Sequence, residues 1–174
     1  VVLFGPESTG KTTLAKQLAA HFKSDWVPEY AREYLQQKWD ETKEICTKKD
    51  LPIIAAEQMA LENQKASTTD TILFCDTDLL VTKIYSEVYF DGYCDSDLHH
   101  FAVNNTYDLY LLLDIDTPWV ADDLRDKPNE RDMMLAAFKQ ALHSFKRTFE
   151  LIQGQGEHRL QAAIQAIQSH FAYV

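Results

Sequence analysis

Apolar and polar residues follow two kinds of pattern along the chain. Short runs of consecutive apolar residues, at 1–4, 72–75 and 109–113, are typical of strands buried on both faces of a sheet. Longer segments place apolar residues every three or four positions, as Leu14 and Leu18 do, which is the spacing of an amphipathic helix. The two patterns alternate along the chain, so the sequence predicts alternating strands and helices.

The predicted elements cover most of the chain. We expect strands at residues 1–4, 25–28, 71–75, 109–115 and 149–153. We expect helices at residues 11–22, 31–39, 48–67, 79–89, 96–104 and 130–147, and a final helix that carries Leu160, Ile164, Ile167 and Phe171. Buried strands separated by helices favour a parallel sheet. The predicted fold class is therefore α/β, a three-layer sandwich with helices on both faces of a five-stranded, mostly parallel sheet, and ligands are expected at the carboxyl ends of its strands.

The segment after the first predicted strand holds the strongest motif in the sequence. Residues 5–12 read Gly-Pro-Glu-Ser-Thr-Gly-Lys-Thr, a complete G-x-x-x-x-G-K-[ST] pattern between a strand and a helix. Gly5 and Gly10 allow backbone conformations that bring amide N–H groups close to phosphate oxygens. Lys11 adds a positive charge for the outer phosphates, and the Thr12 hydroxyl is suited to hold Mg²⁺.

This motif predicts a P-loop that binds a nucleoside triphosphate such as ATP. A glycine-containing turn with a surface lysine is the alternative, but it does not account for all eight positions in this context. The fold is accordingly expected to be that of a P-loop NTPase. The predicted ATP-binding residues are Gly5, Glu7, Ser8, Thr9, Gly10, Lys11, Thr12 and Thr13.

Acidic residues stand at the ends of the second and third predicted strands. Asp76 follows the apolar run 72–75, where a P-loop protein usually carries an acid that organises Mg²⁺. The alternative for Asp76 is to cap the next helix, although Asp78 fits that position better. Glu29 follows the second strand, a place from which its carboxylate can accept a proton from the hydroxyl that receives the phosphate. The alternative for Glu29 is a surface or capping glutamate.

A polar segment at residues 117–131 follows the fourth predicted strand. Such a segment is typical of a lid that closes over phosphates, with Arg125 and Arg131 stabilising charge on the transferred group. The alternative is a solvated loop whose arginines pair with its own acids. Trp119 stands among these charges, either to stack on a flat or cationic ring or to anchor the segment to the core.

Length and composition limit the remaining choices. The 174 residues suffice for one domain, so we expect residues 1–174 to form a single domain. A net charge of -10 without a basic stripe disfavours nucleic acid as a partner. The apolar run 109–113 is too short to cross a membrane, and three cysteines without a C-x-x-C pair fit a reducing cytoplasm. The chain opens on a core strand without a starting methionine, which leaves open a longer parent protein.

Four segments together resemble one family, the ribosylnicotinamide kinase domain of bifunctional NAD-salvage proteins that also carry an NMN adenylyltransferase. The resemblance rests on GPESTGKTTL at 5–14, VPEYAREY at 27–34, CDTDL at 75–79, and YDLYLL at 107–112 with DTPW at 116–119. The first motif is shared by many NTP-binding proteins, whereas PEYAREY is much more specific. The segments cover nearly the whole chain in the family's order.

The resemblance implies transfer of the γ-phosphate of ATP to the 5′-hydroxyl of nicotinamide riboside, giving NMN. Because the pyridinium ring of this acceptor is positive, a pocket of acids and aromatic rings would suit it. Another P-loop kinase for a nucleoside, nucleotide or sugar, and a non-enzymatic domain that senses ATP, stay open as alternatives. We assign catalysis to Lys11, Glu29, Arg125 and Arg131, the metal to Thr12 and Asp76, and the acceptor to Glu29, Tyr30, Arg32, Asp78, Trp119 and Asp122.

Overall fold

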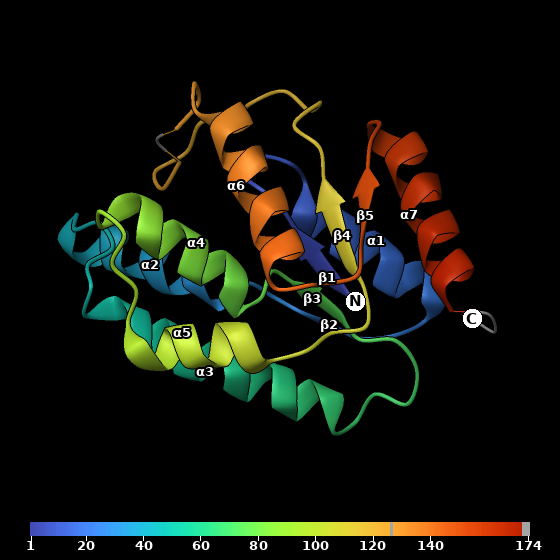
Figure 1. The fold of residues 1–174 in the computed structure, drawn as a ribbon, viewed down its shortest axis with the longest axis horizontal. Helices are drawn as coiled ribbons and strands as arrows, with labels where there is room; N and C mark the ends of the chain where they lie inside the picture. The colour runs from blue at the N-terminus through green and yellow to red at the C-terminus, as the bar shows by residue number, and fades with distance from the viewer. Residues whose placement is uncertain (126, 172–174) are drawn as a thin grey trace.

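The computed structural model describes residues 1–125 and 127–171, and its strands form one parallel sheet. The strands are β1 (Val2–Phe4), β2 (Trp26–Val27), β3 (Phe74–Asp76), β4 (Tyr110–Leu113) and β5 (Phe149–Ile152). Their order across the sheet is β2-β3-β1-β4-β5, and every pairing among them is parallel. The predicted α/β fold is therefore confirmed, with a sheet that is parallel throughout. Figure 1 shows the sheet at the centre of the molecule, between layers of helices.

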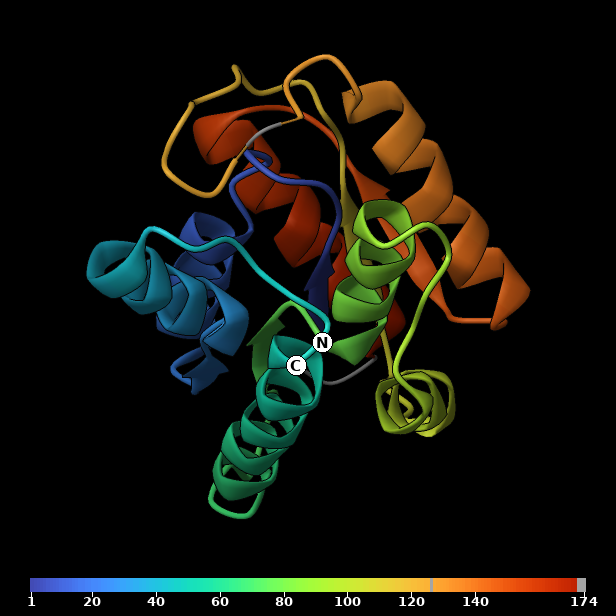
Figure 2. The ribbon, with the colours of Figure 1, turned by 90° about the vertical axis from the view of Figure 1, so that its left-hand side faces the viewer.

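The helices of the described residues cover both faces of this sheet. They are α1 (Lys11–Phe22), α2 (Tyr30–Thr42), α3 (Asp50–Ala66), α4 (Leu79–Tyr89), α5 (Ser96–Asn104), α6 (Arg131–Ser144) and α7 (Gly156–His170). None of these described helices is both long and apolar enough to cross a membrane. Figure 2 shows α2 at the left of the molecule, on the opposite side from α6.

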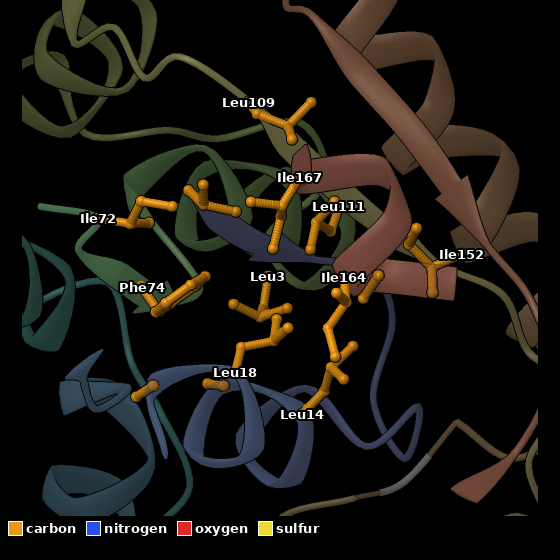
Figure 3. Close-up of a cluster of buried hydrophobic side chains, with 14 of the residues drawn as sticks. Leu3, Leu14, Leu18, Ile72, Phe74, Leu109, Leu111, Ile152, Ile164 and Ile167 are labelled. Carbon is orange, nitrogen blue, oxygen red and sulfur yellow. The ribbon is translucent and has the colours of Figure 1, made fainter. Parts of the chain in front are cut away.

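Alternating side chains of the central strands build a core on each face of the sheet. Leu3 of β1 and Leu111 of β4 pack with Leu18 of α1 and Ile164 of α7 (Figure 3). Burying one such leucine contributes about 1.5–3 kcal/mol. The cluster on the opposite face joins the sheet to α4 and α6 and includes Val2, Phe4, Ile84, Phe138 and Leu142. Both ends of the P-loop are therefore attached to well-packed elements.

The boundaries of two elements near the ligand edge differ from the prediction. β3 pairs with β1 through Cys75 and Asp76, so the strand includes the acid that was expected to follow it. The helix predicted at 31–39 begins at Tyr30 and runs to Thr42, where Lys43 with φ 60° ends it. None of the 13 residues of this helix, all of them described, is fully buried, so its position depends on polar contacts.

A buried carboxylate provides the main contacts between α2 and α3. Asp50 accepts hydrogen bonds from the Tyr34 hydroxyl and the Lys38 ammonium, both at 2.8 Å. It also accepts from the Thr47 amide at 2.6 Å and the Thr47 hydroxyl at 2.7 Å. Burial alone would raise the pKa of Asp50, but these donors outweigh it and lower the pKa to about 2. The carboxylate therefore stays ionised and holds α2 in place.

Candidate active site

The P-loop leaves the carboxyl end of β1 and enters α1. Gly5 has φ 138° and Gly10 has φ 82°, conformations that residues with a side chain rarely adopt. A Cβ atom at Gly5 would also meet the carbonyl oxygen of Leu113 at 3.0 Å. Gly10 is the N-cap residue of α1, and no side chain of a described residue caps this helix. The N–H groups of its first turn are therefore open to an anion.

The side chains of the P-loop hold a positive charge next to these amides. Lys11 Nζ donates to the carbonyl oxygens of Gly5 at 3.0 Å and Pro6 at 2.9 Å. Thr9 is fully buried, and its hydroxyl donates to the same Pro6 oxygen at 2.8 Å. An ammonium group beside a row of open amides has the chemistry of a phosphate cradle.

Thr12 and Asp76 lie together at the predicted metal site. The Thr12 hydroxyl donates to Asp76 Oδ2 at 2.5 Å, while Oδ1 is buried and has no partner among the described residues. Burial raises the pKa of Asp76, and the nearby Lys11 and the Thr12 hydroxyl partly oppose this shift. A hydroxyl beside a carboxylate with an unused oxygen fits the hard oxygen ligands that Mg²⁺ prefers.

The protein supplies only part of a metal coordination sphere. The described residues include no group of three or more His, Cys, Asp or Glu side chains that could hold an ion. A Mg²⁺ ion at Thr12 and Asp76 would therefore take its remaining ligands from phosphate oxygens and water, as it usually does beside a nucleotide. These two residues fit a metal that is bound together with ATP.

Glu29 stands at the start of α2 without acting as its cap. It occupies the N-cap position, but its half-buried side chain accepts no capping hydrogen bond from a described residue. Burial raises the pKa of Glu29; Lys11 lowers it and Asp76 raises it further. The capping alternative is therefore wrong. A carboxylate with a raised pKa near the P-loop is a candidate proton acceptor.

A cleft of about 650 Å³ begins at the metal site and follows α2. This volume is in the usual range for small-molecule sites. The helix residues that line it are three and four positions apart and so share one face of α2. Acidic side chains on its walls outnumber the one basic side chain, Arg32, so the lining carries a net negative charge. The lining residues are Thr12, Pro28, Glu29, Arg32, Glu33, Gln36, Gln37, Asp40, Glu41 and Asp76.

The lid segment contacts α2 through Asp122. The Asp122 carboxylate accepts two hydrogen bonds from the Arg32 guanidinium, at 2.6 and 3.2 Å. It also pairs with Arg125 Nε at 3.2 Å. Burial alone would raise the pKa of Asp122, but the hydrogen bond from Arg32 brings it below its ordinary value. Arg32, Asp122 and Arg125 thus form one charged cluster at the cleft, and of these three only Arg32 lines its wall.

The two ends of the lid segment meet the P-loop at Ser8. The Thr117 hydroxyl donates to the Ser8 carbonyl oxygen at 2.8 Å, and the Val120 amide donates to Ser8 Oγ at 2.9 Å. From the start of α6, Arg131 donates to the carbonyl oxygens of Thr117 at 2.8 Å and Ser8 at 3.3 Å. Arg131 Nε is buried and has no partner among the described residues. The predicted lid and the predicted phosphate cradle are therefore in direct contact; within this segment, Asp126 lies outside the described residues.

Asp78 does not line the cleft, so the prediction that it contacts the acceptor is wrong. Its side chain is 2% exposed and caps α4, with Oδ1 accepting from the amides of Leu80 at 3.1 Å and Val81 at 3.2 Å. Oδ2 accepts from the Tyr110 hydroxyl at 2.8 Å. Both oxygens are engaged inside the protein, so the helix-cap position considered for Asp78 is the one it takes.

Tyr30 and Trp119 also lie outside the cleft lining. The Tyr30 ring stacks on Tyr34 with centroids 5.9 Å apart. The Arg131 guanidinium lies 5.9 Å from the centroid of the Trp119 ring, which borders a separate cavity of about 10 Å³ together with Glu7. This placement fits the anchoring alternative for Trp119 better than stacking on an acceptor.

Two polar residues near the site were not predicted from the sequence. Gln58 of α3 is buried, and its Oε1 accepts from the Tyr30 amide at 2.9 Å, which fixes the start of α2. Arg159 of α7 is buried, and its guanidinium donates to the Thr9 carbonyl oxygen inside the P-loop. Neither residue belongs to a motif, because each reaches the site from a distant helix.

The fold and the loop define a class of protein. A parallel sheet in the order β2-β3-β1-β4-β5, with a G-x-x-x-x-G-K-[ST] loop between its central strand and α1, is the arrangement of P-loop nucleotide-binding proteins. The chain belongs to the AAA domain family, whose family model matches residues 1–159.

Two bacterial proteins are similar to the chain in sequence. It is 30% identical over 125 residues to the trifunctional NAD biosynthesis/regulator protein NadR of Salmonella typhimurium (strain LT2) and, to the same extent, to NadR of Escherichia coli (strain K12). Each match covers 72% of this chain and 30% of the relative, so the chain spans less than a third of the length of these curated relatives. The resemblance to this type of NAD-salvage protein is confirmed.

Solved structures show the same fold. A NadR protein in complex with NR superposes with a TM-score of 0.82 at 23% identity, covering 99% of this chain and 51% of that chain. A NadR protein in complex with NAD and AMP-PNP superposes with a TM-score of 0.75 at 21% identity, and the match covers 99% of this chain and 49% of that chain. Deoxyadenosine kinase from M. mycoides with bound dATP is more distant, with a TM-score of 0.56 at 13% identity. This match covers 96% of this chain and 97% of that chain.

Proposed function

We propose that this domain transfers the γ-phosphate of ATP to the 5′-hydroxyl of nicotinamide riboside and so forms NMN. The observation that carries the proposal is the cleft shared by Thr12, Asp76 and Glu29. It joins a site suited to a triphosphate and its metal to a carboxylate that accepts no capping hydrogen bond from a described residue. A donor site and a proton acceptor in one cleft are what a phosphotransferase with an alcohol acceptor requires.

In this proposal, each residue has a defined role in the transfer. The loop amides and Lys11 bind the phosphates, and Glu29 accepts the proton of the acceptor hydroxyl as its oxygen attacks the γ-phosphorus. The bond from that phosphorus to the bridging oxygen breaks, and ADP leaves with the electron pair. Thr12 and Asp76 would hold Mg²⁺, which supplies charge neutralisation for the phosphates when it is bound.

We propose that two arginines near the P-loop stabilise charge on the transferred group. Arg131 contacts the carbonyl oxygen of Ser8 in the P-loop, and its buried Nε has no partner among the described residues. Arg125 pairs with Asp122 through Nε at 3.2 Å and donates from Nη1 to the Val120 carbonyl oxygen at 2.8 Å, so both of these contacts lie within the lid segment. We therefore propose Arg131 as the main source of positive charge and Arg125 as a residue that joins it when the lid closes.

The charge of the cleft supports a cationic acceptor. Glu33, Asp40 and Glu41 line it beyond Glu29, against one cation, Arg32. Because Arg32 is already paired with Asp122, it is not free to bind an acceptor phosphate. A positive pyridinium nucleoside suits this wall better than a nucleotide does. The NadR structure in complex with NR, which has the same fold, points in the same direction.

A product screen tests the proposal. The protein is incubated with Mg²⁺, ATP and one acceptor at a time: nicotinamide riboside, adenosine, deoxyadenosine, NMN or a pentose, and products are identified by mass spectrometry. We expect ADP and NMN from nicotinamide riboside alone. ADP formed only with another acceptor would identify a different kinase. ATP binding without any phosphorylated product would identify a nucleotide sensor.

The length of the relatives bears on the parent protein. Since the chain covers only 30% of the NadR proteins it matches, we propose that it functions beside an NMN adenylyltransferase domain that would consume the NMN. Conversion of nicotinamide riboside and ATP to NAD by the full-length protein would support this arrangement, and accumulation of NMN would contradict it.

A further inference from the structure

Arg159 is a buried arginine that connects three separate segments at the P-loop. It projects from α7, is 4% exposed, and donates to the carbonyl oxygen of Gly154 at 2.7 Å and that of Asp114 at 3.1 Å. The same guanidinium pairs with the Asp116 carboxylate and donates to the Thr9 carbonyl oxygen. All of these acceptors lie at the ligand edge of the sheet, at the ends of β1, β4 and β5 or in the loops that follow.

The contact with Thr9 holds one end of the Thr9–Gly10 peptide, directly before the first turn of α1. The carbonyl of Thr9 and the N–H of Gly10 belong to one planar trans peptide, so they point in opposite directions. A guanidinium that holds the carbonyl oxygen on the protein side therefore aims the Gly10 N–H to the other side, toward the open first turn of α1.

This peptide would rotate easily without such an anchor. Gly10 has φ 82° and no Cβ atom, and glycine adopts many backbone conformations at little cost. The Thr9 side chain is fixed by its own bond to Pro6, but that bond does not hold the carbonyl group. Arg159 is the contact among the described residues that fixes the Thr9 oxygen through a side chain.

The burial of a charge at this position also calls for a reason other than stability. Transferring a guanidinium from water is costly, and well-packed apolar residues often replace buried ion pairs without loss of stability. One helical turn further along α7, Ala163 and Ile164 supply apolar packing to the core.

We propose that Arg159 is a positioning residue for triphosphate binding, which orients the Thr9–Gly10 peptide so that its N–H contacts a phosphate oxygen. The inference rests on the proposed ATP site and not on the identity of the acceptor. Arg159 does not touch the nucleotide itself in this proposal. Its effect should therefore appear in the affinity for phosphates and not in the affinity for the acceptor.

Binding of inorganic tripolyphosphate tests this role, because this probe has the phosphates of ATP without the nucleoside. Isothermal titration with Mg²⁺-tripolyphosphate and Mg²⁺-ATP would compare the wild type with Arg159→Met and Arg159→Lys. The matched control is Arg147→Met, since Arg147 is a half-buried arginine that donates to the carbonyl oxygen of Val103 at 2.7 Å, in a different part of the fold.

We expect Arg159→Met to weaken both probes by about tenfold, the loss of one hydrogen-bonded charged donor. Arg159→Lys should lose less, and Arg147→Met should bind both probes as the wild type does. A folded Arg159→Met protein with wild-type affinity for tripolyphosphate would overturn the proposal, and so would a loss seen with ATP alone. If the Met variant does not fold, the Lys variant, which keeps the charge opposite Asp116, decides by the same criteria. Failure of the wild type to bind either probe would instead count against the proposed function.

Discussion

The Thr12 hydroxyl donates to the Asp76 carboxylate at 2.5 Å, which joins the first turn of α1 to the end of β3. The register of the sheet brings this about, because Asp76 pairs with Leu3 of β1, two residues before the P-loop begins. The carboxylate therefore lies level with the loop, and its second oxygen remains unused among the described residues. This position supports the proposed role of Asp76 at the metal.

Asp76→Asn should lower turnover by about 10- to 100-fold and raise the Mg²⁺ concentration needed for half-maximal rate, because the amide is a weaker metal ligand than the carboxylate. Initial rates over a Mg²⁺ series check this. Asp78→Ala is the contrasting variant: it should leave the Mg²⁺ dependence unchanged but lose about 1–3 kcal/mol of unfolding free energy, since the cap and the partner of Tyr110 disappear. An unchanged Mg²⁺ dependence in the Asp76 variant would remove this residue from the metal site.

Lys11→Ala should reduce turnover at least about 100-fold, because the charge proposed for the phosphates is lost. Thermal stability should change little, because the hydrogen bonds of Lys11 to described residues go to carbonyl oxygens of its own loop. Steady-state rates and melting temperatures are the measurements. Lys16→Ala is the matched control on the same helix, where the ammonium lies over the Trp26 ring at 5.1 Å, outside the cleft. Wild-type turnover in the Lys11 variant would refute the phosphate role.

The raised pKa of Glu29 predicts an acidic limb in the pH–rate profile. A general base must be ionised, so kcat should rise with pH through a pKa above the ordinary value of 4.5. Glu29→Gln should remove this limb and lower kcat at least about 100-fold. A Gln variant that keeps both the rate and the limb would assign the base to another residue.

The same shift has a consequence for stability. The folded state favours protonated Glu29, so the wild type binds more protons folded than unfolded between the ordinary pKa and the raised one. Its stability therefore falls as pH rises through this window, and Glu29→Gln should be the more stable protein above it. Urea unfolding at pH 4 and pH 8 checks the sign. The unfolding free energies of the wild type and the variant should be similar at pH 4, and the variant should have the larger value at pH 8.

Asp122→Asn should raise KM for the acceptor about 3- to 10-fold, because Arg32 loses the carboxylate that orients it at the cleft. Stability should change by less than about 1 kcal/mol, since the pair is partly exposed. Asp123→Asn is the control, because among the described residues its carboxylate accepts a hydrogen bond from the Gln36 amide, at 3.1 Å, and forms no ion pair. Equal KM values for the two variants would mean that Asp122 has no special role in the lid.

Asp50→Asn should cost about 1–3 kcal/mol at pH 7, because its charged hydrogen bonds attach α2 to α3. The folded pKa of about 2 lies below the ordinary 3.8, so this contribution is complete above the ordinary value and disappears as pH falls through about 2. Chemical unfolding at several pH values measures it. The unfolding free energies of the wild type and the variant should differ at neutral pH and become equal in strong acid. A difference that does not change with pH would mean that altered packing, and not the lost charge, causes the effect.

Local motifs explain which parts of the site were predictable from the sequence. The roles of Gly5 and Gly10 follow from neighbouring residues, and Asp76 follows from the end of an apolar run, so each has a local signal. Asp78 was also recognisable as a cap. Its exclusion from the cleft depended on Tyr110, which occupies its second oxygen from a strand 32 residues away.

Contacts between distant elements explain what the sequence did not reveal. The charged residues around Trp119 in the sequence suggested a ring that stacks on a ligand. In the structure, the Arg131 guanidinium already lies over this ring. Arg159 lies 150 residues from Thr9 and looks like any arginine of an amphipathic helix until α7 packs beside α1. Helix positions are periodic in the sequence, whereas the partner that a buried polar group finds is fixed only by the tertiary fold.

The absence of fully buried residues among the 13 described positions of α2 has a consequence for how this domain changes over evolutionary time. The P-loop is attached to the sheet and its hydrophobic clusters, so substitutions there are expected to disturb folding as well as the proposed binding of ATP. The cleft face of α2 carries the proposed acceptor-binding residues, on a helix that Asp50 and Gln58 contact from α3. Under the proposed function, new acceptor preferences can therefore arise by exchanging polar residues on one helix face, while the P-loop and the core remain as they are.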